Sequence, residues 1–169
     1  MDKAPSSADR PRPIRLLLNR AETDDPGEVT VVEQRPARAM VADLLGVAEG
    51  AALVLRQRVV AEDGTPAAFV SMWLDPELAM ATGIDHVEPL TSSVRQLIES
   101  ATGRRLSQIT ERLTSRRPTS AEYKALGLGR SAPVLGMLAT VTDTEGSPVL
   151  VVDLAVPGDL HEVVDTYAL

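Results

Sequence analysis

The chain has 169 residues, which is enough for one domain with its own hydrophobic core. Its 17 basic and 24 acidic residues give a net charge of −7, which argues against duplex DNA binding by this chain alone, because neutralising phosphates supplies most of that affinity. Cysteine is absent and aromatic residues make up 2%, which excludes disulfide scaffolds and thiolate zinc sites and disfavours base stacking. No apolar run approaches the roughly 20 residues that span a bilayer, and the polar N-terminus lacks a secretion signal, so we expect a cytoplasmic domain that makes no membrane contact.

The sequence divides into a polar leader and a patterned domain. Residues 1–28 are rich in proline and turn-forming residues, and we expect a flexible leader or the remnant of an interdomain linker. Residues 29–169 form the expected ligand-binding domain. Its strands are expected over 29–33, 53–60, 67–74, 106–116, 134–142 and 149–156, with one more over 162–167. Its helices are expected to begin at Pro36, at Asp75, after the cap residues 91–93 and at Pro118.

One arrangement of elements occurs twice. A helix ending in Leu-Gly is followed by a strand, a turn with a Gly-x-Pro motif, and a second strand. The first copy contains Gly46 and Pro66, and the second contains Gly127 and Pro148, at an offset of 80 to 82 residues. This repetition predicts an internally duplicated α+β domain built on one continuous, mainly antiparallel sheet.

Several residues invite a functional interpretation, each with a plainer alternative. Arg56 and Arg58 share one face of a strand and could clamp a carboxylate or phosphate, or both could face solvent. Ser93 could present a helix N-terminus to an anion, or only cap the helix. Arg112 and Arg116 share one face of a strand, and this face could line a cavity or be exposed to solvent.

Other residues suggest chemistry less directly. Trp73 could stack on a ligand, although a strand tryptophan usually belongs to the core. Glu111 and Asp153 could form a general acid/base pair, as an enzyme would need, or be solvated carboxylates. His86 and His161 have no metal-ligand spacing, so we expect neither a metal nor another cofactor.

Three stretches together resemble a known family. They are LGVAEGAALVLRQRVVAEDGTPAAFVSMWLDPEL, SSVRQLIESATG and SRRPTSAEYKALGLGRSAPVLGMLATVTDTEGSPVLVVDLAVPGD, in this order. They resemble a UTRA domain, the effector-binding domain of HutC-type GntR transcription regulators, which shares its fold with chorismate lyase. The resemblance covers about residues 29–167. It implies a six-stranded antiparallel sheet with flanking helices, a cavity for a small-molecule effector, and no catalytic residue.

The resemblance also implies partners. Regulators of this kind are homodimers that contact DNA through a winged helix-turn-helix, and too few residues precede residue 29 for that domain. We therefore expect either a domain separated from a longer regulator or a stand-alone sensor, which would meet DNA only through a domain outside this chain. The alternatives are a chorismate lyase-like enzyme and a degenerate ligand-binding partner protein.

Site residues follow from the family position by position. Members that bind phosphosugars carry a strand arginine pair and a helix-cap serine, which Arg56, Arg58 and Ser93 match, whereas Arg95 stands where tyrosine is common. After the first Gly-x-Pro turn, the position where the family has glutamate holds Val70, and Ser71 follows it. After the second turn, the corresponding position holds Leu150, and Asp153 lies three residues later. Near the end of the domain, Leu160-His161 replaces an arginine-tyrosine pair. These departures favour a less polar ligand than a phosphosugar. We expect an anionic or carbonyl-bearing metabolite to bind between the sheet and the Ser93 helix. The predicted ligand-binding set is Arg56, Arg58, Ser71, Ser93, Arg95, Arg116 and Asp153.

Overall fold

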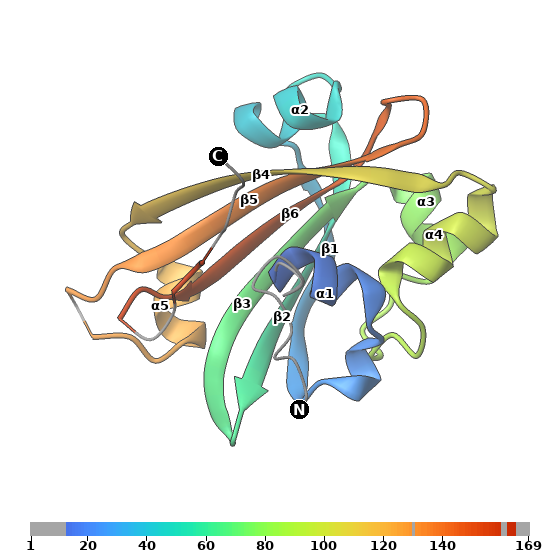
Figure 1. Cartoon of the computed structure of the whole chain (residues 1–169). Coiled ribbons are helices and arrows are strands. Elements are labelled where there is room, and N and C mark those ends of the chain that lie inside the picture. The colour runs from blue at the N-terminus through green and yellow to red at the C-terminus, as the bar shows by residue number, and fades with distance from the viewer. Residues whose placement is uncertain (1–12, 130, 160–161, 165–169) are drawn as a thin grey trace, which may run out of the picture.

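The computed structural model describes residues 13–129, 131–159 and 162–164, and shows a six-stranded sheet with helices on both faces (Figure 1). The strands are β1 (Gly27–Pro36), β2 (Ala52–Glu62), β3 (Thr65–Leu74), β4 (Leu106–Arg116), β5 (Val134–Asp143) and β6 (Pro148–Pro157). The helices are α1 (Pro13–Asn19), the 3-10 turn η2 (Glu22–Asp24), α2 (Ala39–Leu45), α3 (Pro76–Thr82), α4 (Val94–Thr102) and α5 (Ser120–Ala125). The predicted α+β class and six-stranded sheet are therefore confirmed.

The strand order is β1-β2-β3-β6-β5-β4, and every neighbouring pair is antiparallel. β3 and β6 meet in the centre, and β1 and β4 form the two edges. In the sequence repeat, an offset of 81 residues makes Leu150 equivalent to Phe69 and Ala155 equivalent to Leu74. In the sheet, Phe69 pairs with Ala155 and Leu74 pairs with Leu150, so each residue faces the equivalent of the other. The two halves thus meet about an approximate two-fold axis, as the repetition in the sequence predicts.

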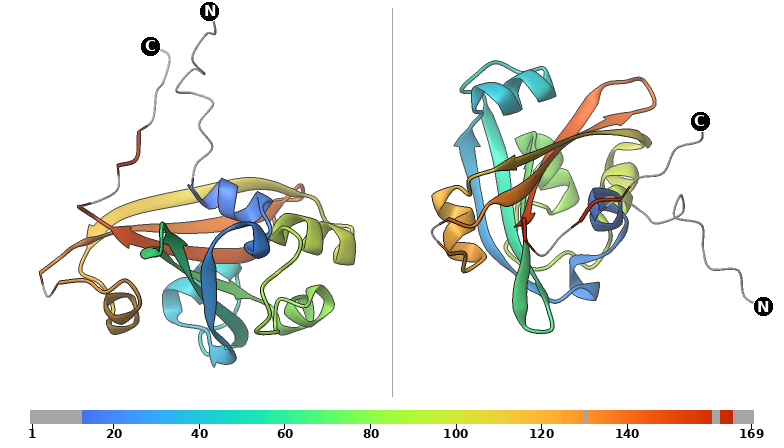
Figure 2. Two further views of the ribbon diagram at one scale, coloured as in Figure 1. Left: turned by 90° about the horizontal axis from the view of Figure 1, so that it is seen from below. Right: turned by 60° about the vertical axis from the view of Figure 1, so that its left-hand side comes forward.

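Both faces of the sheet are covered. The main aliphatic core lies on one face, where buried residues of α1, α3 and α4 join alternate residues of the central strands. On the other face, α2 packs near Trp73 and the segment after α5 packs near Phe69, in two smaller clusters. The two side views place α1 and α5 on opposite sides of the sheet (Figure 2).

The N-terminal segment differs from the sequence-based expectation. Residues 13–28 belong to the expected flexible leader, yet Ile14 and Leu18 of α1 are 0% and 3% exposed and belong to the main core. A pair of apolar residues four apart is too short a pattern to separate a docked helix from a linker. The folded unit therefore begins no later than Pro13, and residues 1–12 lie outside the described residues.

Smaller differences concern element ends. Pro36 closes β1, where it pairs with Ala52 at an edge strand, and α2 begins only at Ala39. Gly46 and Gly103 end α2 and α4 in the left-handed conformation, as expected. In the described part of the expected last strand, residues 162–164, no strand forms.

Candidate functional site

The predicted site residues lie on two different faces of the sheet. Arg56 and Arg58 of β2 point to the face covered by α1 and α4, where Ser93 and Arg95 also lie. The other three occupy the opposite face, where Ser71 pairs across the strands with Asp153, and Asp153 contacts Arg116. Because the sheet separates the two groups, one small ligand cannot contact all of them.

Arg56 is fully buried, with 0% of its surface exposed, and all five of its N–H donors have acceptors within the protein. Nε donates to Oε1 of Glu22 over 3.0 Å, and Nη2 donates to Oε2 of the same carboxylate. The remaining donors bind the backbone carbonyls of Ile84, His86 and Glu88. Arg56 therefore joins η2 to the loop that precedes α4.

Arg58 strengthens the same junction. It is 4% exposed, and its Nη2 donates to the backbone carbonyl of Glu22 over 2.8 Å and to that of Asp25. Burial lowers the pKa of this guanidinium, against the opposing effect of Glu22 and Asp25, but an arginine keeps its charge. The two arginines share a face, as predicted, and both bind segments of their own chain.

Ser93 and Arg95 begin α4 and play different parts. Ser93 is buried and accepts a hydrogen bond from the backbone N–H of Gln96 over 3.2 Å, which forms a capping box and confirms the capping interpretation. Arg95 is half exposed, with Nε 3.0 Å from Glu99 Oε1 and Nη2 3.4 Å from the Leu106 carbonyl. Its guanidinium lies at the rim of a groove.

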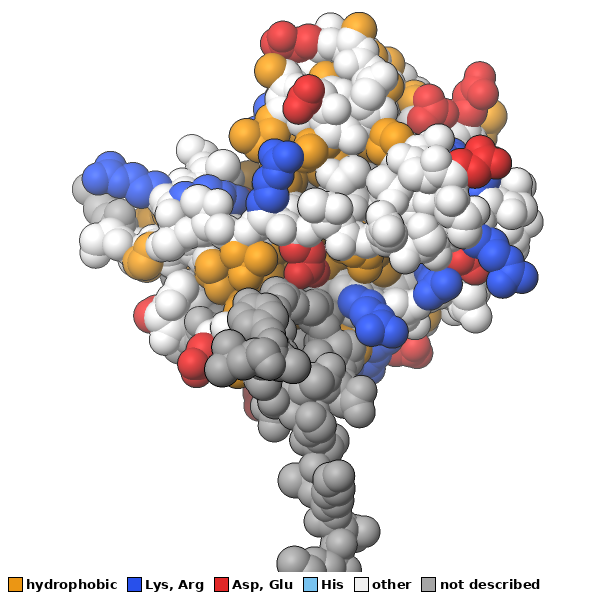
Figure 3. Space-filling model, turned by 45° about the horizontal axis from the view of Figure 1, so that its top comes forward, with side chains coloured by type: hydrophobic (Ala, Val, Ile, Leu, Met, Phe, Trp, Pro, Cys, Tyr) orange, Lys and Arg blue, Asp and Glu red, His pale blue; other side chains and the backbone are white. Residues whose placement is uncertain are grey.

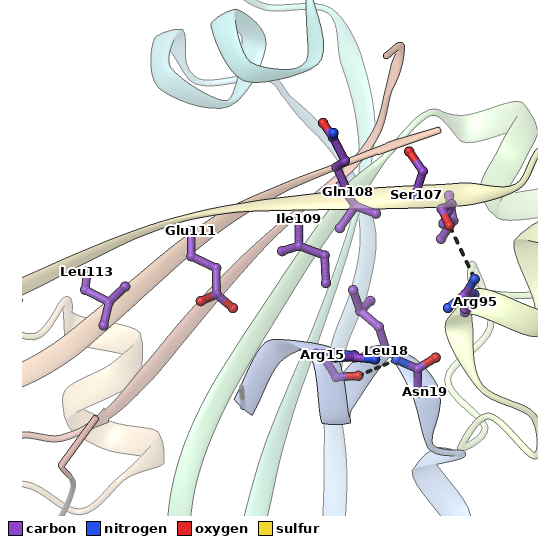
Figure 4. Close-up of a pocket in the computed structure, with 11 residues that line it drawn as sticks. Arg15, Leu18, Asn19, Arg95, Ser107, Gln108, Ile109, Glu111 and Leu113 are labelled. Atoms are coloured by element: carbon purple, nitrogen blue, oxygen red, sulfur yellow. Dashed lines mark hydrogen bonds between the residues drawn. The ribbon is translucent and has the colours of Figure 1, made fainter. Parts of the chain in front are cut away.

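This groove has a volume of about 680 Å³ and lies between α1, the start of α4 and the edge strand β4 (Figure 4). Ile109, Glu111 and Leu113 point from β4 toward α1, which contributes Arg15, Leu18 and Asn19. Ser107 and Gln108 border the groove on β4, but their polar ends point away from α1 (Figure 4), and the Ser107 hydroxyl donates to the Asp143 carbonyl over 2.7 Å. Seen from the top, this side of the molecule carries hydrophobic side chains with acidic and basic ones between them (Figure 3). The lining is therefore mixed, with apolar side chains beside charged and amide groups, and a concave surface with a few convergent polar groups can hold a small molecule.

On the opposite face, Arg116 fastens α5 to the sheet. Its Nη1 and Nη2 each lie 2.7 Å from an oxygen of Glu122, and Nη2 is 3.5 Å from Asp153 Oδ1. Burial raises the pKa of Asp153, although the charge of Arg116 opposes this. Ser71 accepts a hydrogen bond from Gln57 Nε2 over 3.0 Å. These contacts give the cluster a clear structural role.

The remaining candidates separate in the structure. Trp73 is buried beneath Arg38, whose guanidinium carbon is 5.6 Å from the ring centroid, as expected of a core residue. Glu111 lines the groove and Asp153 lies on the other face, so the pair considered for acid/base catalysis is not brought together. The described residues hold no cluster of three acidic or histidine side chains suited to a metal, and none of their helices is long and apolar enough to cross a membrane. Leu160 and His161 lie outside the described residues.

The sequence did not predict that Arg15, Asn19 and Gln108 line the groove, or that Glu22 pairs with Arg56. The apolar residues at 14 and 18 were the one local signal of α1. Nothing near Glu22 signals its role, because its partners lie 34 to 68 residues away along the chain.

Comparisons with known proteins agree with this fold. A transcriptional regulator from Streptomyces coelicolor has 26% identity and a TM-score of 0.69, covering 82% of this chain and 89% of that one. A GntR-family regulator from Bacillus cereus, at 14% identity, has a TM-score of 0.73 over 85% and 98% of the two chains. The effector domain of PhnF from Mycobacterium smegmatis, at 19% identity, has a TM-score of 0.70 over 84% and 87%.

A search of curated proteins finds no match. The family model for the UTRA domain, in contrast, matches residues 27–162, which is most of the sequence and includes all six strands. Together with the shared fold of GntR-family effector domains, this match shows that the chain belongs to the UTRA domain family.

Proposed function

We propose that this chain is the effector-sensing domain of a HutC-type GntR regulator, and that the groove beside β4 binds a small molecule with an anionic or carbonyl group. One observation carries this proposal: α1 forms a wall of the groove, and α1 precedes the residues that match the family, with only η2 between them. A ligand in the groove therefore touches the segment through which a preceding domain would be connected.

The groove chemistry defines the ligand class. Arg15 and Arg95 supply positive charge, and Asn19 supplies an amide group. Leucine and isoleucine side chains form the floor, and Glu111 disfavours a second negative charge near β4. A molecule with one acidic or carbonyl group and a less polar body matches this lining.

The mechanism is a shift between two arrangements of α1 against α4 and the sheet. A ligand moves this equilibrium only by binding one arrangement more tightly than the other. In a cytoplasmic homodimer, the shift would reach DNA through a winged-helix domain connected to α1. The domain itself performs no chemistry on the ligand.

A thermal-shift screen of phosphosugars, carboxylic acids and aromatic acids on the full chain tests this proposal. A ligand should raise the melting temperature by mass action. Arg95→Gln should need at least about ten times more ligand for the same rise, because it loses one charge-assisted contact. Arg112→Gln is the matched control, because Arg112 is exposed on the opposite face of β4.

Three results would contradict the proposal. A hit that stabilises wild type and Arg95→Gln equally would move the site elsewhere. The absence of any hit would favour a degenerate partner protein. Release of 4-hydroxybenzoate from chorismate by the purified chain would favour the lyase-like enzyme.

A further inference from the structure

We propose that the Glu22 carboxylate is the built-in occupant of a carboxylate-binding cradle, and that a carboxylate-bearing effector competes with it and thereby releases the segment around η2. The inference rests on the proposed function, since it assigns an anion class and a means of regulation to the same sensor. Glu22 lies before the family-matching residues 27–162, so the occupant comes from outside the matched domain.

The cradle is shaped for a planar group with two oxygens. Arg56 Nε lies 3.0 Å from Oε1 of Glu22, and Arg56 Nη2 donates to Oε2. The backbone N–H of Leu90 donates to the same Oε2 over 2.9 Å. A fork of guanidinium donors joined by one backbone donor is suited to any carboxylate, whether or not it is attached to this chain.

Burial makes an anion in the cradle obligatory. Arg56 is 0% exposed and the Glu22 side chain is 5% exposed, so the guanidinium has no water to replace a lost partner. An unpaired buried charge is strongly unfavourable, and a free carboxylate of the right size is the simplest substitute. The carbonyl groups of the loop before α4 cannot serve, because they neutralise no charge.

The cradle and the groove are bounded by the same two segments. Leu18 and Asn19 line the groove, and Glu22 follows three residues later on the same segment. Arg95 lines the groove from α4, and Leu90 lies on the loop that leads into α4. The backbone N–H of Thr23 also donates to the Leu90 carbonyl over 3.2 Å, so displacing Glu22 loosens the bond between the two segments.

Glu22 competes at a high effective concentration, because it belongs to the same chain. Small carboxylates should therefore not displace it from the wild-type protein unless they also fill the groove. Removing the internal carboxylate should make the cradle accessible to acetate alone, which gives a test that does not require the natural effector.

The experiment measures the melting temperature of full-length wild type, Glu22→Ala and Glu22→Ala/Arg56→Met in sodium acetate and in sodium chloride of equal ionic strength. We expect Glu22→Ala to melt lower than wild type and to gain at least about 2 °C from acetate relative to chloride. Wild type and the double variant should show no acetate-specific gain. If Glu22→Ala does not fold, Glu22→Gln replaces it, since a neutral amide occupies the cradle weakly and should also yield to acetate.

The proposal is overturned if neither variant gains from acetate, or if the double variant gains as much as Glu22→Ala. It is also overturned if Arg95→Gln weakens the binding of a groove ligand while Glu22→Gln leaves the affinity for that ligand unchanged. In that case the proposed sensor function would still stand. Conversely, acetate rescue without any hit in the ligand screen would retain the cradle and reject the sensor.

Discussion

At the scale of single residues, two arginines on opposite faces of the sheet act in the same way. Arg56 binds the carboxylate of Glu22 and so holds η2, and Arg116 binds that of Glu122 and so holds α5. Breaking one partner of a buried pair is costly, because the other charge is left desolvated. The sequence identified both arginines as candidates for ligand contacts, and their carboxylate partners explain why such residues are also needed for the fold.

The close approach of Arg116 to Gly136 yields a prediction. A Cβ at position 136 would lie 2.8 Å from Arg116 Nε, and the guanidinium cannot retreat without losing its two bonds to Glu122. Gly136→Ala should therefore lower the free energy of unfolding by about 2 kcal/mol, measured by urea denaturation.

A double-mutant cycle gives the control for this prediction. In an Arg116→Ala background the obstacle is gone, so Gly136→Ala should cost less than about 0.5 kcal/mol there. Gly129→Ala should also be near neutral in wild type, since Gly129 has open space around an added Cβ among the described residues, with none of their atoms within 4 Å apart from its chain neighbours. Equal costs of Gly136→Ala in both backgrounds would contradict the steric explanation.

At the scale of elements, α4 and α5 form where their capping signals predict them. α4 and α5 both begin with a capping box, made by Ser93 with Gln96 and by Thr119 with Glu122. In α5 the glutamate has two roles, because it caps the helix and pairs with Arg116. One side chain thus couples the start of a helix to its docking on the sheet.

This double role makes α5 sensitive to acid. Burial raises the pKa of Glu122, but hydrogen bonds from Arg116 and from the Thr119 backbone outweigh it and lower the pKa below its ordinary value of 4.5. The carboxyl group therefore protonates at higher pH in the unfolded chain than in the folded one. Its contribution to stability is complete above the ordinary value and is lost as the pH falls through the folded pKa.

Glu122→Gln should consequently flatten the pH dependence of unfolding between about pH 5 and pH 3. At neutral pH the variant should be about 2 kcal/mol less stable, below the figure for a fully buried pair because Arg116 is partly exposed. Chemical denaturation across this range measures both effects, and Glu49→Gln in an exposed turn is the control. Because the charge of Glu122 also raises the pKa of Asp153, the difference reports Glu122 together with the coupled change at Asp153. A wild-type slope that persists in the variant would refute the assignment.

The difference between local and long-range contacts explains what the sequence could predict. Strands with alternating patterns, helix caps and the Gly-x-Pro turns are encoded within a few residues, and their order identified the fold. The location of the site depended on which loops reach Arg56 and Arg58, and those contacts join residues far apart in the chain. Strand periodicity correctly placed the two arginines on one face but carried no information on their partners.

At the scale of the whole molecule, two similar halves surround the β3–β6 pair, but α1 and η2 add to one face only. This addition breaks the approximate two-fold symmetry and creates the groove, whose other walls are β4 and α4. The family match begins at residue 27, after α1, yet α1 contributes to the main core. The folded unit of this chain is therefore larger than the segment that matches the family.

The final prediction tests whether α1 belongs to the folded unit. Ile14 is 0% exposed in the main core, whereas Leu16 on the same helix is 40% exposed. Ile14→Ala should lower the free energy of unfolding by about 3 kcal/mol through lost burial and the cavity left behind. Leu16→Ala, with the same kind of change two residues away, should shift it by less than about 0.5 kcal/mol. Two variants of equal stability in urea would show that α1 does not dock on the domain, and the groove would then lose the wall on which its proposed sensing role depends.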